Sequence, residues 1–444
     1  MPNQLSRREA MKLGLAGATA AAMGGAWALA QPATAPATRP VKGQARSVIQ
    51  IWLWGGPPHL DTFDPKPEAG PDYCGPLSSP IATNVAGMRI CELMPLLAQQ
   101  ADKFSLIRSM THGNNGHETA AYLVQTGRDP ADKIVYPSMG AVVSLFKGYD
   151  AGYKGLVAPY IVLTQPQGRF SEAGFLGPKY KPFATGGNPA AAQFTVEGIV
   201  APGITRQRQE ERRDLLARLN ALEKAMPDDP EFVAAKAAEN RAYDLILGDE
   251  GKVFDLELEK VETRDEYGRN GFGQCCLLAR RLVERGIPYV TINNGGWDTH
   301  KGNFAAMRNK LPQVDRGLAT LLKELSERGL LDSTILWCCG EFGRTPRVDK
   351  EPPWEGGRGH YGKCFSALVA GGGFKGGHIV GESDARGESV RNRPVYPGDL
   401  IGSMYELLGI DPDSTLRHPQ GHLVRLTPSA DQGVRTGGRL REIM

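Results

Sequence analysis

Acidic and histidine residues follow several apolar segments of this chain, at the points where those segments end. Carboxylate oxygens and imidazole nitrogens together are ligands that divalent metals use in proteins. If the apolar segments are parallel strands, the loops that follow them meet at one edge of a sheet. The candidates are His59, Asp61 and Asp64 after residues 47–54, Asp298 and His300 after 289–293, Glu341 after 334–339, and His360 in a later glycine-rich loop.

These positions predict a divalent metal site, with Zn, Mn, Ca and Mg all left open. Each residue taken singly is more often a turn residue or a helix cap than a ligand, and only the joint placement after strands favours a metal. The predicted ligands are Asp61, Asp298, His300, Glu341 and His360.

A second group of candidates surrounds residues 112–130. His112 and His117 flank the sequence GNNG just before a predicted helix, whose free backbone N–H groups favour an anion such as phosphate or sulfate. His117 and the nearby Thr119 are the candidate catalytic residues. Arginines could add bidentate contacts to the anion, although ion pairing is the ordinary role of arginine. The predicted anion-binding residues are Arg128, Arg344, Arg358 and His112.

The elements that must position these residues alternate between strands and helices. Residues 47–54 (SVIQIWLW) are rich in β-branched and aromatic side chains and stop at GGPP, which is typical of a buried strand. An apolar stripe formed by Val314, Leu318, Leu321, Leu322 and Leu325 predicts a helix over 312–328. The alternation predicts an α/β fold with a mostly parallel sheet between helices. Further strands are predicted at 104–109, 159–164, 289–293, 334–339, 365–370 and 379–380, and helices at 93–102, 117–125, 271–284 and 399–408.

The chain divides into five parts. Residues 1–30 have a basic start with Arg7 and Arg8, a weakly apolar stretch and a final Ala-Leu-Ala, which resembles a twin-arginine signal peptide. We therefore expect export of a folded protein by the twin-arginine translocon to the periplasm or beyond. A proline-rich tether at 31–45 precedes an α/β domain at 46–430, with a charged helical insertion, or cap, near 204–265. Residues 431–444 form a polar tail that we expect to be loosely held.

Composition excludes several classes of protein. The net charge of +3 falls further once the signal is removed, so nothing indicates a nucleic-acid partner. After residue 31 no apolar run approaches eighteen residues, and we expect no stable membrane anchor. Four of the seven cysteines form two adjacent pairs in apolar segments, which predicts buried thiols; Cys74 with Cys91 is the one pair that could form a disulfide.

Nearly the whole mature chain resembles the exported "domain of unknown function 1501" family. The segments that carry the resemblance are SVIQIWLWGGPPHLDTFDPKP, INNGGWDTH, GEFGRTPRV, GRGHYGK and LVAGGGFKGGHIVGESD. That family is similar to the alkaline phosphatase and sulfatase superfamily, whose members hydrolyse phosphate or sulfate esters with one or two metals at strand ends. The resemblance implies an alkaline-phosphatase-like fold. It also implies metal-ligand positions at Asp61, Asp298, His300 and His360.

Two positions depart from the superfamily pattern. Glu341 falls where the superfamily has the Asp of an Asp-His-Gly motif, and Phe342 replaces the histidine of that motif. His117 falls where the superfamily has its Ser, Thr or Cys nucleophile. His117 is therefore left open as a nucleophile, a metal ligand or an acid/base group.

Two functions are compatible with these residues. The first is a metal-dependent hydrolase of a phosphate or sulfate ester outside the cytoplasm. The alternative is a non-catalytic module of the same fold that binds an anionic glycan, sulfated or phosphorylated. Convergence of the candidate ligands and His117 around one site would favour the enzyme.

Overall fold

Eight strands form one sheet in the computed structural model of the chain, which describes residues 43–130, 134–166, 172–192, 194–196, 199, 204–219 and 230–444. The sheet order is β12-β4-β11-β8-β1-β7-β5-β6, and within it only β11 runs antiparallel to its neighbours. The predicted α/β fold with a mostly parallel sheet is confirmed. The strands are β1 (Ser47–Trp52), β4 (Phe104–Met110), β5 (Tyr160–Leu163), β6 (Phe183–Ala184), β7 (Tyr289–Asn293), β8 (Thr334–Cys339), β11 (Phe365–Ala370) and β12 (Ile379–Val380).

Strand β1 shows why these segments read as continuous apolar runs. All six of its residues are buried, because helices cover both faces of the sheet. Ile49 and Ile51 belong to the core on one face, whereas Val48 and Trp52 belong to the core on the other. The side chains of a strand alternate between faces, so a central strand is apolar on both faces, with Ser47 and Gln50 as buried polar exceptions in β1.

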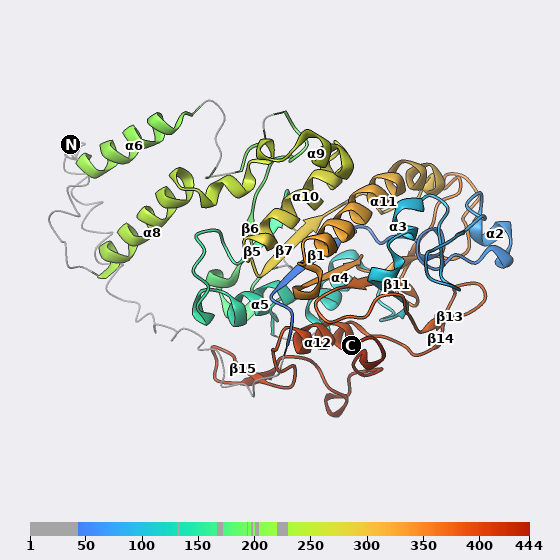
Figure 1. Cartoon of the computed structure of the whole chain (residues 1–444). Helices are drawn as coiled ribbons and strands as arrows, with labels where there is room; N and C mark the ends of the chain where they lie inside the picture. The colour runs from blue at the N-terminus through green and yellow to red at the C-terminus, as the bar shows by residue number, and fades with distance from the viewer. Residues whose placement is uncertain are drawn as a thin grey trace, which may run out of the picture.

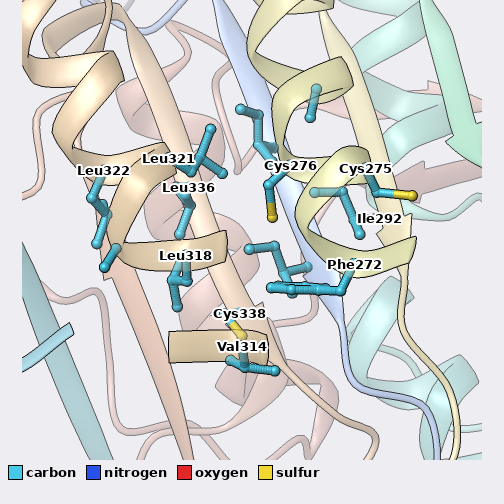
Figure 2. Close-up of a cluster of buried hydrophobic side chains, with 14 of the residues drawn as sticks. Phe272, Cys275, Cys276, Ile292, Val314, Leu318, Leu321, Leu322, Leu336 and Cys338 are labelled. Atoms are coloured by element: carbon cyan, nitrogen blue, oxygen red, sulfur yellow. The ribbon is translucent and has the colours of Figure 1, made fainter. Parts of the chain in front are cut away.

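Helices lie on both sides of the sheet (Figure 1). One face is covered by α3 (Pro95–Ala98), α10 (Gly271–Glu284) and α11 (Asn303–Glu327), and the other by α4 (His117–Thr126), α5 (Met139–Lys147) and α12 (Pro397–Leu407). Figure 2 shows the first of these cores, in which Leu318 of α11 and Cys276 of α10 lie against the sheet near Leu336. The sheet is therefore held between two apolar layers, and its edges and loops remain for other roles.

Three helices differ from their predicted extents. The sequence predicts a helix that starts at Pro312, a residue that is favoured in the first turn. In the structure helix α11 begins earlier, at Asn303, and contains Pro312 in its interior. Helix α5 was not predicted at all; the Ser138 hydroxyl caps it by accepting from the N–H of Ala141 at 3.4 Å. The helix expected over 93–102 is the short α3 followed by the 3-10 turn Ala101–Lys103. The carboxylate of Asp315 accepts from two N–H groups in the first turn of α3.

Outside the sheet the chain forms short elements and a set of charged helices. In Figure 1, α6 (Arg206–Leu219) and α8 (Pro230–Leu247) extend away from the sheet, within the range 204–265 where an inserted cap was expected. The remaining elements include α2 (Pro71–Cys74), α9 (Val261–Tyr267), β2 (Ile81–Ala82), β3 (Arg89–Ile90), β9 (Gly343–Arg344), β10 (His360–Tyr361), β13 (Glu382–Ser383), β14 (Val390–Asn392), β15 (Thr415–Arg417) and β16 (Leu423–Arg425).

The C-terminal end of the chain packs against the α/β domain. The expected signal peptide, residues 1–30, and the tether up to residue 42 lie outside the described residues. At the other end Leu440 and Ile443 are fully buried, and Lys375 donates its N–H to Ile443 O at 2.7 Å. The end of the chain is thus held more firmly than its polar composition indicated.

Two further findings concern the whole described chain. The seven cysteines are all buried free thiols, as the apolar pairs predicted, and Cys74 and Cys91 are not joined by a disulfide. None of the helices among the described residues is both long and apolar enough to span a membrane.

We predict that Leu318→Ala lowers the free energy of unfolding by about 2–5 kcal/mol, because it leaves a cavity beneath α11 where Leu318 is fully buried. Urea unfolding followed by circular dichroism measures this. Gln313→Ala, on the exposed side of the same helix, should change the free energy by less than about 0.5 kcal/mol. Equal effects of the two substitutions would contradict the packing described here.

Candidate metal centre

The sheet brings loops from distant parts of the sequence to one edge. Strands β1, β7 and β8 are mutually parallel, so the loops that follow them leave the sheet on the same side. Strand β4 has the same direction and leads into α4, which begins at His117. The short pair β9–β10 sets His360 opposite Arg344.

Three imidazoles surround the carboxylate of Asp298. Its Oδ2 lies 3.3 Å from Nε2 of His117, and its Oδ1 lies 3.2 Å and 3.1 Å from Nε2 of His300 and His360. The Nε2 atoms of His300 and His360 are 2.9 Å apart. Ligand atoms of His117, Asp298 and His360 all lie within 4.8 Å of one another. We call His117, Asp298, His300 and His360 the four-residue cluster.

Hydrogen bonds fix the tautomers of two of these histidines. His117 Nδ1 lies 2.6 Å from Glu341 Oε1, and His360 Nδ1 lies 2.8 Å from the carbonyl oxygen of Asn115. A carboxylate and a carbonyl only accept, so in both rings Nδ1 carries a proton and donates it. When these rings are neutral, each turns the lone pair of Nε2 toward the cluster. Histidines that bind metal through one ring nitrogen typically donate the N–H of the other to a carboxylate or a carbonyl oxygen in this way.

A lone pair facing a carboxylate oxygen is repulsive, so the contact between His117 and Asp298 requires a positive charge. A proton on His117 supplies one, and the pKa of His117 is accordingly raised, chiefly by its hydrogen bond to Glu341. A divalent cation bound by Nε2 would replace that proton, since metals compete with protons for imidazole. The donor set therefore fits a metal.

Glu341 is fully buried and acts through His117. Besides His117, its carboxylate accepts from the N–H of Gly55 at 2.9 and 3.2 Å, which ties it to the loop after β1. The sequence predicted Glu341 as a ligand in its own right. In the structure its oxygens face His117 Nδ1 and the backbone, so its position is that of a residue that orients His117.

Arg344 holds the carboxylate of Asp298 from the buried side. Its Nη2 donates to Asp298 Oδ1, and its Nε and Nη1 donate to the carbonyl oxygens of Gly56 at 3.1 Å and Arg358 at 3.2 Å. Burial would raise the pKa of Asp298, but the hydrogen bond and charge of Arg344 outweigh it and lower the pKa to about 2. Arg344 was predicted to bind an anion; here its donors are directed to protein groups.

Asp61 lies outside the four-residue cluster. Its carboxylate accepts hydrogen bonds from Nε and Nη2 of Arg358, both at 2.8 Å, and from Nδ2 of Asn303 at 2.7 Å. Asp61 and Arg358 are both completely buried as side chains, and buried charges of opposite sign pair because neither is solvated. The structure thus gives the predicted ligand Asp61 and the predicted anion contact Arg358 to each other.

The remaining predicted residues, His112, Thr119 and Arg128, form hydrogen bonds to protein groups. His112 donates from Nε2 to Glu341 O at 2.7 Å and accepts at Nδ1 from the N–H of Asn114, and burial lowers its pKa to about 4. His112 is therefore neutral and offers no charge to an anion. The Thr119 hydroxyl donates to Asn114 Oδ1 at 2.9 Å. Arg128 donates to Arg425 O and to Gln432.

Aromatic residues that the sequence analysis did not select surround the histidines. Trp54 stacks on His117 at 5.8 Å between ring centroids, and the buried Phe342 stacks on His360 at 4.7 Å. Phe342 also touches His117, so the residue that replaces a superfamily histidine forms an apolar floor beneath two imidazoles. The position of Trp54 at the end of the first strand was the available signal for its role.

The chain belongs to the family described as "Protein of unknown function (DUF1501)", which matches residues 45–436. The resemblance inferred from the sequence motifs is confirmed. No curated protein matches the chain by sequence.

Solved structures similar to this chain belong to the alkaline phosphatase and sulfatase superfamily. They include the PsFucS1 sulfatase from Pseudoalteromonas sp., with 15% identity, 91% of this chain and 72% of that one covered, and a TM-score of 0.34. A phosphonate monoester hydrolase from Silicibacter pomeroyi has 11% identity, coverage of 83% and 74%, and a TM-score of 0.37. An alkaline phosphatase from the Antarctic bacterium TAB5 has 11% identity, coverage of 76% and 94%, and a TM-score of 0.31. These are distant likenesses.

We predict that Glu341→Gln lowers the pKa of His117 from its raised value toward or below the ordinary 6.5, because the charged acceptor is lost. A raised pKa in the folded state means that protonation of His117 stabilises the fold. This stabilisation is fully present below pH 6.5 and is lost as the pH rises through the pKa of folded His117. Titration of the histidine ring by NMR, in protein treated with chelator, measures the shift. Glu118→Gln, which removes a charge from the exposed neighbour, should leave the pKa nearly unchanged; a response as large as that of Glu341→Gln would refute the pairing.

We predict that Asp61→Asn destabilises the fold by at least about 3 kcal/mol while leaving the metal content of the folded protein unchanged, because it strips a buried arginine of its counter-charge. Urea unfolding and elemental analysis test the two halves. The exposed pair of Asp72 with Lys350 provides the control, and Asp72→Asn should have little effect. Loss of metal at unchanged stability would restore Asp61 as a ligand.

Proposed function

We propose that this chain is a metal-dependent hydrolase of a phosphate or sulfate ester and that it works outside the cytoplasm. The observation that carries the proposal is the four-residue cluster, in which two imidazoles with fixed tautomers and one carboxylate converge from the start of α4, the loop after β7 and β10. Such an arrangement supplies three protein ligands and leaves a position open, which is the pattern of catalytic rather than structural metal sites.

His117, Asp298 and His360 are the ligands that we propose. Two imidazole nitrogens and one carboxylate oxygen suit zinc or manganese better than calcium or magnesium, which prefer oxygen alone. When bound, such a metal would polarise an ester oxygen and lower the pKa of a water molecule. Glu341 and Asn115 O keep the Nδ1 protons of the two ligand histidines away from the metal side.

The residues of the four-residue cluster favour water as the attacking group. The cluster contains no hydroxyl or thiol, and the nearby Thr119 directs its hydroxyl to Asn114. His300 lies beside the proposed ligands, and its side chain is 38% exposed. Its Nε2 faces His360 Nε2 at 2.9 Å and Asp298 Oδ1 at 3.2 Å, which both accept, so Nε2 carries the proton of the neutral ring and Nδ1 holds the lone pair. We assign His300 to receive the proton of the attacking water, and His117 to metal binding rather than to nucleophilic attack.

Export is the part of the proposal that the signal-like residues 1–30 support. The proposed ligands come from loops far apart in the sequence, so the site exists only once the chain is folded. Passage through the twin-arginine translocon as a folded protein would allow the metal to be acquired before export. Arg7 and Arg8 are the residues on which this route depends.

A non-catalytic module that binds an anionic glycan is the second candidate. The feature that favours it is the histidine at position 117, where the superfamily has its nucleophile. In such a module the same metal would bind the sulfate or phosphate group without cleaving the ester. Metal loading with glycan binding but no hydrolysis would support this candidate.

We predict that the purified protein binds about one zinc or manganese ion per chain and that chelation abolishes hydrolysis of aryl phosphate or sulfate esters. His360→Ala should weaken metal binding at least about 100-fold, since it removes a ligand. His300→Ala should retain the metal but lower kcat by about 10²–10⁴, because it removes a proton acceptor. Elemental analysis and steady-state kinetics measure the two effects.

The exposed His378 offers a matched control, and His378→Ala should change neither metal binding nor kcat. A folded wild-type protein that binds no divalent metal would overturn the proposal. If His300→Ala loses metal as His360→Ala does, His300 is a ligand and the assigned proton acceptor is wrong.

A further inference from the structure

A cavity of about 290 Å³ opens at the carboxyl ends of β5 and β7, next to the start of α10. We call it the β5/β7 cavity. It lies at the same edge of the sheet as the four-residue cluster, because the loop after β7 contributes both Asn294 to the cavity and Asp298 to the cluster. Open α/β sheets bind ligands at this edge.

The lining carries no charge and mixes polar with apolar groups, the apolar ones including Ile292 and Cys275. Among the described residues that line the cavity, Thr164, Asn188, Asn293 and Asn294 bring a hydroxyl and three carboxamides, and none is acidic or basic. Phe272 adds an aromatic ring. Carboxamides both donate and accept, as hydroxyl groups do, whereas a charged ligand would find no partner of opposite sign here.

Two residues of the lining, Asn293 and Thr164, have unusual features. The Oδ1 atom of Asn293 is shielded from solvent and has no donor among the described residues, while its Nδ2 donates to Gln165 O at 3.3 Å. Thr164 has a φ of 70°, a left-handed conformation that a β-branched residue rarely adopts. Bonds on both sides hold it there, to the Thr185 hydroxyl and from the N–H of Gly186. Strained backbone and unpaired polar atoms gather at binding sites.

Trp54 connects this cavity with the cluster. The backbone N–H of Trp54 donates to the carbonyl oxygen of Asn294 at 3.1 Å, and the half-buried indole ring stacks on His117. Trp54 thus contacts both the loop after β7, which lines the cavity, and a residue of the four-residue cluster.

We infer that the β5/β7 cavity binds an uncharged, hydroxyl-bearing ring of the sugar type, which forms the part of the substrate that does not react. The placement of the ester at the cluster rests on the proposed function, whereas the binding of the ring in the cavity is independent of it. The asparagine carboxamides bond the hydroxyl groups of the ring, and Phe272 packs against an apolar ring face.

Gly271 allows the cavity to be filled without disturbing its walls. It is the first residue of α10 and lines the cavity, and a Cβ placed on it would meet only Asn188 Oδ1, at the ordinary distance of 3.4 Å. Gly271→Leu therefore extends a side chain into the space, and Gly271→Ala is the matched control.

Calorimetric titration of the full mature chain, loaded with zinc, would use methyl glycosides of glucose, galactose, fucose and xylose. We expect wild type and Gly271→Ala to bind at least one of them, and Gly271→Leu to bind it at least about tenfold more weakly, with unfolding temperatures alike. With a sulfated or phosphorylated form of that sugar, KM should rise by a similar factor in Gly271→Leu, while kcat/KM for a small aryl ester stays unchanged.

Absence of binding of every glycoside to wild type, or equal binding by Gly271→Leu, would overturn the inference. If Gly271→Leu unfolds at a lower temperature, Asn293→Leu, which removes one of the carboxamides that line the cavity, provides the second variant and must weaken binding too. Failure of the proposed function shows separately, as absence of metal or of aryl ester hydrolysis while glycoside binding persists.

Discussion

The buried guanidinium of Arg344 is the group on which the geometry of the site depends. A charged group without solvent must be satisfied by protein, and Arg344 finds its partners in the carbonyl oxygens of Gly55, Gly56 and Arg358 and in the carboxylate of Asp298. These partners lie on three different loops. Moving any one of them leaves a buried donor or a carboxylate unpaired, so the loops after β1 and β7 and before β10 are fixed relative to one another.

The loop after β1 can approach this closely only because it contains two glycines. A Cβ on Gly55 would lie 2.3 Å from the N atom of Asp298, and a Cβ on Gly56 would meet the ring of Phe342 at 2.5 Å. Both residues also have positive φ angles, which glycine adopts without strain. The pair GGPP that ends the first strand therefore serves the site directly, beyond ending the strand.

Charge is arranged in two separate pairs around this frame. Asp61 and Arg358 satisfy one another in full burial, whereas Asp298 has Arg344 on its buried side and histidines on its exposed side. Only the second pair leaves ligand atoms accessible. The carboxylate of Asp298 is stabilised by Arg344 and still has exposed oxygen, and the Nδ1 protons of His117 and His360 point away from it. This arrangement is a suitable place for a cation. The uncharged β5/β7 cavity lies at the same edge of the sheet, and there we propose that an uncharged part of the same ligand binds.

The sequence by itself predicted seven of the eight strands of the sheet, all but β6, and the edge at which the site lies. Strand ends at Asn293, Cys339 and Ala370 were predicted to the residue, because apolar runs bounded by glycine report burial on both faces locally. Only the tertiary structure decided which candidates meet. Nothing near Asp61 in the sequence shows that Arg358, 297 residues away, takes its carboxylate. The same holds for Glu341, which contacts His117 from 224 residues away. Local pattern determines an element and its direction, whereas the partner of a buried charge depends on which loops the folded sheet places together.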